Sequence, residues 1–447
     1  MLGENQARSL ADAVLKRCGV DAGEVSISAE DSALTRFANN VIHQNVAESN
    51  VSITVRIIQG KRSGTATTNR LDERALDEAV ARARANAQAS PEDPDDPGLP
   101  GPAAYRKAAV FDPRTAEMAA QERAEQVGIV CRLAAEKDLN ASGAFSTGSS
   151  EMIVANTAGV FAYHPATRAD FQTVMMSADS SGRAQQSSWC AADLPAEVLG
   201  KEAVRKAEMG RNPRKIEPET FPVVLEPYAV LDLLQMLNFS GIGAQSVLDG
   251  RSWMNDRIGV KAVSEMVHLW DDGLDPLGIP LPFDYEGVPK QRVDIIKEGV
   301  VQGPVYDRRT ALRSGKQSTG HAMPPSFRDA GPMAINLFLG SGDSSLDAMI
   351  ASIDRGVYIN RFWYTRLVHP KDCVITGMTR DGVYMIENGE VAYPIKNLRF
   401  TQSYVDALNR VEAVGADTKL LVNDYGHFAS RVPALKIGAF HFTGTTV

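Results

Sequence analysis

The chain has 447 residues, of which 44% are hydrophobic and 23% are charged, and its formal net charge is −8. This composition is typical of a globular protein with two to four domains. Because the charge is mildly negative and no Lys/Arg run stands out, we exclude nucleic-acid binding. No apolar run approaches the roughly 20 residues of a membrane span, and we expect neither a signal peptide nor membrane attachment. Four widely spaced cysteines without a C-x-x-C pair predict reduced thiols and a cytoplasmic location.

The N-terminal part shows a helix–strands–helix pattern that occurs twice before residue 210. Apolar residues with helical spacing predict helices over residues 6–18, 71–90, 115–137 and 195–209. Strict alternation of apolar and polar residues over 51–57 predicts a half-buried strand. Gly60 and Lys61 then predict a turn into a second strand.

Two proline-rich stretches predict the domain boundaries. Residues 90–102 read SPEDPDDPGLPGP, which cannot continue a helix or a sheet. Prolines at 213, 218 and 222 mark the second boundary. We therefore expect an N-terminal α+β subdomain (1–90), a Pro-rich linker (91–104), a second α+β subdomain (105–215) and a β-rich C-terminal domain (216–447).

The C-terminal half contains mostly strand signals. A buried strand over 223–225 leads into a helix over 228–239, and one further helix is predicted over 344–353. Asp381-Gly382 and Asn388-Gly389 each predict a tight hairpin turn. The expected fold class is therefore α+β, with mixed helix–strands–helix units followed by a mostly antiparallel β domain with a few helices.

The histidines do not form a local zinc motif. No two of the seven lie four or five residues apart on one helix, and none is followed by Glu. A metal site assembled from distant residues stays open. The chain also lacks a G-x-S-x-G nucleophile elbow, and Cys373 lies in a strand-like run where we expect a buried thiol.

The densest polar, glycine-punctuated stretch runs from residue 308 to residue 321, and we expect it to be a loop. A surface turn and a functional loop are equally compatible with this pattern. Polar donors on a flexible backbone suit the main chain of a peptide. The candidate peptide-binding residues are Arg308, Ser318, Thr319, Gly320 and His321.

Four sequence blocks stand out: TRFANNVIHQN (35–45) with GTATTN (64–69), VVLEP (223–227), the stretch 306–321, and IENGEV (386–391) with PIKNL (394–398) and Val414-Gly415. In these blocks the chain resembles the TldD/PmbA family, whose members are also described as modulators of DNA gyrase. In order and spacing the blocks cover nearly the whole chain.

The resemblance implies a zinc site that this sequence lacks. In catalytic members of the family, the metal site resembles an H-E-x-x-x-H motif on a helix, completed by a cysteine near the C-terminus. Here Leu234, Gln235 and Phe239 fall at the motif positions, residues 423–427 occupy the region of the cysteine, and no cysteine follows Cys373. The resemblance therefore implies a TldE/PmbA-like member with no catalytic residue, no metal and no cofactor of its own.

Three hypotheses follow. In the leading one, the chain is the non-catalytic subunit of a TldD/TldE-type zinc metallopeptidase, pairs with a TldD-like chain that carries the zinc, and helps to bind unfolded peptides. In the second, it is a stand-alone homodimer that binds peptides or a small molecule without catalysis. In the third, it is an enzyme with relocated catalytic residues, for which His321, His369 and Cys373 are the candidates.

Overall fold

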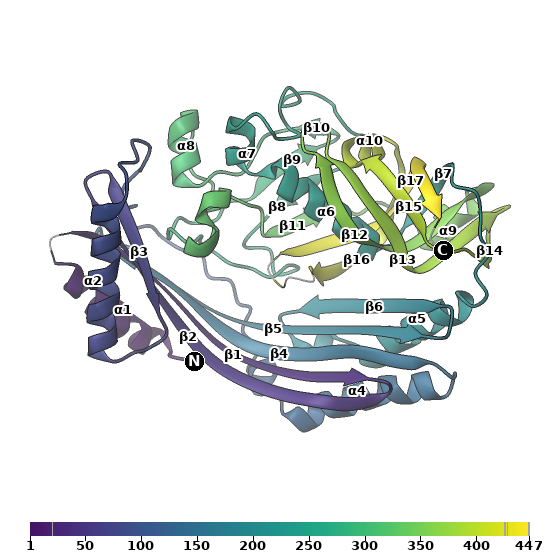
Figure 1. Cartoon of the computed structure of the whole chain (residues 1–447), viewed down its shortest axis with the longest axis horizontal. Coiled ribbons are helices and arrows are strands. Elements are labelled where there is room, and N and C mark those ends of the chain that lie inside the picture. Colours follow the sequence, from purple (N-terminus) through teal and green to yellow (C-terminus); the bar gives the residue numbers. More distant parts are fainter. Residues whose placement is uncertain (20, 424–425, 427, 446–447) are drawn as a thin grey trace.

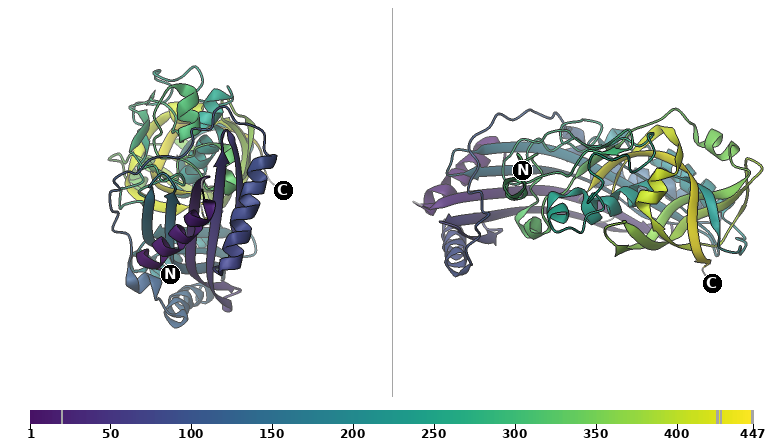
Figure 2. Two further views of the ribbon diagram at one scale, coloured as in Figure 1. Left: turned by 90° about the vertical axis from the view of Figure 1, so that its left-hand side faces the viewer. Right: turned by 90° about the horizontal axis from the view of Figure 1, so that it is seen from above.

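The computed structural model describes residues 1–19, 21–423, 426 and 428–445. The N-terminal half forms a long, strongly curved sheet, and the β-rich C-terminal half lies on the concave side of this sheet (Figure 1). Seen from above, the molecule is elongated, with α1 at one end and the end of β17 towards the other (Figure 2). None of the described helices is long and apolar enough to cross a membrane.

The N-terminal sheet has six strands in the order β3-β2-β1-β4-β5-β6, and every neighbouring pair is antiparallel. Its strands are β1 (Ala22–Ala38), β2 (Val41–Gln59), β3 (Arg62–Thr68), β4 (Asn140–Asn156), β5 (Phe161–Met176) and β6 (Ser181–Ser188). Because β1 pairs with β2 on one side and with β4 on the other, residues 1–90 and 105–215 share this single sheet.

Helices cover only the convex face of this sheet. Alternate residues of β1, such as Val25 and Ile27, point to that face and are buried against α1 and α2, while Phe145 and Phe171 are buried against α4 and α5. The helices are α1 (Glu4–Cys18), α2 (Glu73–Ala89), α3 (Pro113–Ala116), α4 (Ala120–Ala135) and α5 (Ala196–Met209). The opposite, concave face carries polar residues such as Ser26 and also the buried Val154 and Ala162, which pack against Phe283 of the C-terminal half.

The C-terminal domain contains an 11-stranded sheet that is mainly antiparallel. Strand β17 pairs with β15 and with β7, and the path β17-β15-β13-β12-β7 therefore closes on itself as a barrel. The strands are β7 (Thr220–Leu225), β8 (Leu269–Asp271), β9 (Val293–Lys297), β10 (Val300–Val301), β11 (Asn336–Leu339), β12 (Arg355–His369), β13 (Val374–Glu387), β14 (Glu390–Pro394), β15 (Leu398–Ser403), β16 (Val411–Val422) and β17 (Ala429–Thr445).

Short helices fill and cover this domain. The apolar helix α6 packs against β12 and β17 and belongs to the largest hydrophobic core. It continues directly into a π-helical turn over Asn238–Ile242. The helices are α6 (Pro227–Leu237), α7 (Ala244–Leu248), α8 (Arg308–Ser314), α9 (Leu346–Ala351) and α10 (Tyr404–Asn409), with 3-10 turns over Ala191–Asp193 and Pro325–Ala330.

The predicted α+β class is confirmed, but two local predictions are wrong. The helix expected over 115–137 is interrupted between α3 and α4, because Asp112 caps the short α3 and Ala119 starts a new helix whose Glu122 accepts from the Ala119 N–H. Asp381-Gly382 is no hairpin turn but a bulge within β13, opposite Asn360 where the register with β12 shifts. Asn388-Gly389 does form the predicted turn between β13 and β14, with both φ angles positive (53° and 79°).

The acidic, Pro-rich segment is bound along the molecule. Asp96 is buried and pairs with Arg56 of β2 at 2.6 Å. Two arginines of α8, Arg309 and Arg313, pair with Asp93 and Asp95. The segment therefore connects one end of the N-terminal sheet to the C-terminal domain.

Candidate functional site

A cleft lies between the concave face of the N-terminal sheet and the C-terminal domain. Its cavity volume is about 690 Å³. The sheet side is lined by small hydroxyl residues of three neighbouring strands, Ser26, Ser28, Ser52, Thr54, Thr65 and Thr67. The opposite side is lined mainly by apolar groups, among them Pro280, Tyr285, Pro324, Ile335 and Val422.

Strand alternation explains the hydroxyl-rich face. Ser26 and Ser28 alternate along β1 with Val25 and Ile27, which are buried beneath the helices on the convex face. Across the sheet, the hydroxyls of Thr54 and Thr67 lie 2.9 Å apart on paired strands. Each hydroxyl can donate and accept a hydrogen bond. The face therefore offers polar contacts that suit a peptide main chain, and the charged residues Glu30, Glu151 and Arg168 also line the cleft.

Two side chains of β5 span the cleft and hold the C-terminal domain. His164 Nε2 lies 3.0 Å from the Pro280 carbonyl oxygen, and Arg168 Nη1 donates to the Gly426 carbonyl at 2.6 Å. Burial lowers the pKa of His164 to about 4, so its imidazole is neutral and Nε2 carries the donated proton. These contacts set the separation of the two walls.

Tyr285, which lines the cleft, is flanked in the chain by two buried carboxylates, Asp284 and Glu286. Burial and the neighbouring Glu286 raise the pKa of Asp284 to about 7, although three backbone N–H groups donate to it. Arg328 contacts Glu286 at 3.0 Å and Glu24 of β1 at 3.9 Å. The guanidinium therefore joins the C-terminal domain to the N-terminal sheet.

The helix with the degenerate motif positions lies in apolar surroundings. Leu234 is fully buried in the C-terminal core. Phe239 is 41% exposed, and its ring packs edge-on against Phe428 at 5.3 Å. Gln235 is half-buried, and within the described part of the chain its side-chain nitrogen has no hydrogen-bond partner.

These residues do not fit zinc. Two of the three are hydrocarbon side chains, and a neutral amide replaces the carboxylate that would act as general base. Among residues 1–19, 21–423, 426 and 428–445, no group of three or more His, Cys, Asp or Glu side chains is placed to hold a metal ion. Of the segment expected at the family cysteine, residues 424, 425 and 427 lie outside the described residues.

The polar stretch from residue 308 is not a single loop as expected. Residues Arg308–Ser314 form helix α8, because the Asp307 carboxylate caps it by accepting from the Thr310 N–H at 2.7 Å. The Arg308 guanidinium donates to the carbonyls of Pro97 and Gly98 at 3.1 and 2.7 Å. Arg308 thus binds an extended, Pro-rich main chain, although the bound segment belongs to its own molecule.

The other four candidate residues follow as a loop that folds back on the chain. The hydroxyls of Ser318 and Thr319 both donate to the Tyr306 carbonyl, at 3.2 and 3.1 Å. Gly320 has a φ of +75°, and a Cβ there would lie 2.5 Å from a carbonyl oxygen. His321 is buried, and its Nε2 lies 2.9 Å from Asp271.

The structure therefore brings Ser318 to His321 together but places none of the five candidates among the residues that line the cleft. Their assignment to peptide binding stays a prediction. The hydroxyl face was not predicted, because no strand was expected over the residues of β1. The alternating segments around Ser26-Ile27-Ser28 and Ser52-Ile53-Thr54 carry the signal that could have found it.

Besides His321, described above, two residues were considered for relocated catalysis, and their surroundings differ. His369 is exposed and lies 3.1 Å from Asp372. Cys373 is buried as predicted, but it lies in the turn between β12 and β13 and not in a strand. Burial raises the pKa of its thiol to about 12, with Ser240 donating to the sulfur at 3.1 Å. A buried, protonated thiol is a poor nucleophile.

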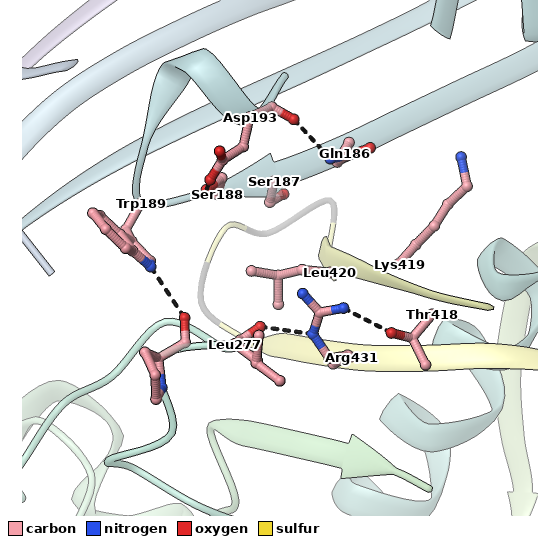
Figure 3. A pocket seen from close by; sticks show the side chains of 11 residues that line it. Gln186, Ser187, Ser188, Trp189, Asp193, Leu277, Thr418, Lys419, Leu420 and Arg431 are labelled. Atoms are coloured by element: carbon pink, nitrogen blue, oxygen red, sulfur yellow. Dashed lines mark hydrogen bonds between the residues drawn. The ribbon is translucent and has the colours of Figure 1, made fainter. Parts of the chain in front are cut away.

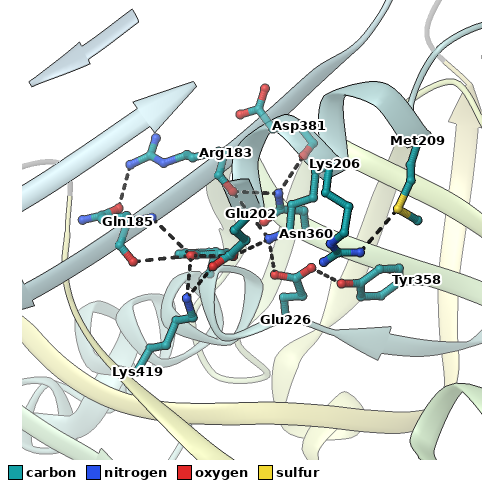
Figure 4. A network of polar contacts seen from close by, with 12 residues as sticks. Arg183, Gln185, Glu202, Lys206, Met209, Glu226, Tyr358, Asn360, Asp381 and Lys419 are labelled. Carbon is teal, nitrogen blue, oxygen red and sulfur yellow. Dashed lines mark hydrogen bonds and ion pairs between the residues drawn. The ribbon is translucent and has the colours of Figure 1, made fainter. Parts of the chain in front are cut away.

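A buried polar network fastens the N-terminal layer to the C-terminal layer (Figure 4). The Lys206 ammonium on α5 contacts Glu202 at 2.7 Å and Glu226, at the start of α6, at 2.5 Å. Burial opposes ionisation of Glu202, yet Lys206 and Lys419 hold its pKa at about 2. Tyr358 of β12 donates to Glu226. The network fixes the layers that enclose the cleft.

Fold and site together define a protein with the architecture of a metallopeptidase family, in which the residues at the expected zinc-motif positions, Leu234, Gln235 and Phe239, do not fit zinc. Three family models match in series: PmbA/TldA metallopeptidase domain 1 over residues 23–87, the central domain over 114–211 and the C-terminal domain over 218–444. The chain belongs to the PmbA/TldD metallopeptidase family.

Similar proteins agree with this assignment. The metalloprotease PmbA of Escherichia coli O157:H7 is 23% identical over 90% of this chain and 89% of its own length. The metalloprotease TldD homologue of Buchnera aphidicola subsp. Acyrthosiphon pisum is 28% identical over 57% of this chain, which covers 50% of that relative. The crystal structure of TldE from Thermococcus kodakarensis has a TM-score of 0.87 at 21% identity and covers 98% of this chain and 99% of its own. This last likeness concerns the fold.

Proposed function

We propose that this chain is the non-catalytic, TldE/PmbA-like subunit of a TldD/TldE-type zinc metallopeptidase that acts on unfolded peptides. One observation supports the proposal: in a chain that matches all three family domains, Leu234, Gln235 and Phe239 stand at the positions where the resemblance implies the zinc ligands and the general base. The zinc and the hydrolytic chemistry then belong to a TldD-like partner. Such a complex would work in the cytoplasm.

The role of this subunit is to hold an extended peptide. The cleft supports this role because its sheet side presents hydroxyls at regular strand spacing, and its other side is apolar. An extended peptide needs partners for its main-chain groups when it leaves water. Short hydroxyl side chains satisfy those groups whatever the peptide sequence, which suits unfolded substrates of varied composition.

Affinity purification of the tagged chain from its own cells, followed by native mass spectrometry, tests the proposal. The expected product is a 1:1 complex with a chain of similar size that holds one zinc ion. A zinc-free homodimer would instead support the stand-alone peptide- or small-molecule-binding protein. An isolated chain that binds stoichiometric zinc and cleaves peptides would contradict both.

A further inference from the structure

A second groove lies between β6 and β16, where the N-terminal sheet faces the C-terminal domain (Figure 3). Its volume is about 380 Å³, and it is lined by Ser187 and Trp189 from the end of β6, by Leu420 of β16 and by Leu277. Figure 3 shows Ser187 and Leu420 on opposite sides of the space. Both strands are edge strands, because β6 pairs with β5 and β16 pairs with β17 on one side each.

On the edge of β6 that faces away from β5, backbone groups of residues 183 and 185 are hydrogen-bonded to side chains of the same chain. The Arg183 carbonyl accepts from Lys206 and Asn360, and the Gln185 N–H donates to Tyr228. The backbone N–H and C=O groups of residues 183 and 185 therefore point away from β5. Because strand residues alternate, the next outward residue is Ser187, which lines the groove.

The same reasoning applies to β16. The Val422 carbonyl accepts from the side chain of Gln185 at 2.8 Å, so Val422 points away from β17. The backbone groups of Leu420, two residues earlier, also point away from β17. Within the described part of the chain, the outward backbone groups of Ser187 and Leu420 have no hydrogen-bond partner.

The walls of the groove are held in place. The Trp189 indole N–H donates to the Pro276 carbonyl at 3.1 Å. Arg431 donates to the Leu277 carbonyl at 2.8 Å and to the Thr418 hydroxyl at 2.7 Å. Leu277 remains 56% exposed beside the two strand edges. The groove thus combines unpaired main-chain groups with apolar surface, as a strand-adding peptide site does.

We propose that this groove binds an extended peptide segment, which adds as a strand to the free edges of β6 and β16. The span from Thr418 to Leu420 covers about 7 Å, so two or three peptide residues pair there. The proposal rests on the proposed role in peptide handling and adds a second contact site outside the central cleft. Apolar side chains of the segment pack on Leu277 and Trp189.

Hydrogen exchange of the full chain tests the groove. The probe is a ten-residue peptide of alternating Val and Thr with flanking Lys residues. We expect it to slow amide exchange at least about fivefold in segments 186–188 and 418–421, because edge amides exchange freely until they are paired. The same peptide with alternate amides N-methylated keeps its side chains and should give no slowing. Equal slowing by the methylated peptide would overturn strand addition.

Matched variants locate the binding. Leu277→Arg should abolish the slowing in both segments, whereas Leu312→Arg, at a residue of similar exposure (54% against 56%) on α8, should leave it unchanged. Thr54→Trp, which fills the central cleft, should also leave it unchanged. Slowing confined to β1 and β2 would overturn the groove while leaving the proposed function intact. Absence of slowing anywhere would count against both.

Discussion

The buried Lys206 gives the sharpest test of how the two layers are held together. Its side chain is 1% exposed, and its ammonium lies between the carboxylates of Glu202 and Glu226. Lys206→Met keeps the volume of the side chain but leaves Glu226, with a side chain 5% exposed, without its cation. Removing one partner of a buried ion pair costs about 3–5 kcal/mol. Because Tyr358 still donates to Glu226, we expect a loss near 3 kcal/mol.

Urea unfolding followed by circular dichroism measures this loss. The matched control is Lys201→Met on the same helix, where the side chain is 63% exposed and its ammonium pairs with Glu197 at 2.6 Å. An exposed pair of this kind contributes at most about 1 kcal/mol. The two Lys→Met variants should therefore differ by at least about 2 kcal/mol in free energy of unfolding.

A second substitution separates charge from packing. Adding Glu226→Gln to Lys206→Met removes the uncompensated carboxylate, and part of the lost stability should return. If Lys206→Met unfolds at the same urea concentration as Lys201→Met, the buried network does not stabilise the contact between the layers and the reasoning is refuted.

Three further predictions concern single residues. The pKa of His164 is lowered to about 4, below the unfolded value of 6.5, so stability should fall by about 3 kcal/mol as pH drops from 6.5 to 4; His164→Gln should remove this fall in pH-dependent urea titrations. Cys373, buried and with a pKa of about 12, should resist iodoacetamide at pH 8 in the native chain, whereas half-exposed Cys190 should react, as mass spectrometry of the digest can show. Gly64→Ala would bring a Cβ within 2.1 Å of the α2 backbone and should lower the free energy of unfolding by about 1–3 kcal/mol in urea titrations. Gly101→Ala, with no neighbour within 4 Å, should not lower it.

Helices with a clear apolar stripe were predictable from the sequence. Residues 6–18, 71–90 and 195–209 correspond to α1, α2 and α5, whose buried residues follow the predicted spacing. The turn at Asn388-Gly389 was predictable for a local reason too, since both residues tolerate positive φ. The same signal gave a wrong prediction at Asp381-Gly382, because residues that tolerate positive φ occur in β-bulges as well as in hairpin turns.

The cleft could not be predicted from local pattern alone. Strand β1 was missed because its outer half, with Glu30, Asp31 and Ser32, carries little apolar alternation. The contact between Asp271 and His321 joins residues 50 positions apart, and that between His164 and Pro280 joins residues 116 apart. Neither contact leaves a spacing signal in the sequence. The expectation that the chain lacks the zinc motif rests on the sequence alone, because Leu234, Gln235 and Phe239 carry no imidazole, thiolate or carboxylate.

The most direct test of the account measures zinc and peptide hydrolysis in the purified chain alone. Unfolded, carboxymethylated casein serves as substrate, and zinc is quantified by mass spectrometry of the metal. The account predicts well below one zinc ion per chain and no hydrolysis, because Leu234, Gln235 and Phe239 provide no zinc ligand set. One zinc ion per chain together with hydrolysis that a chelator abolishes would contradict it.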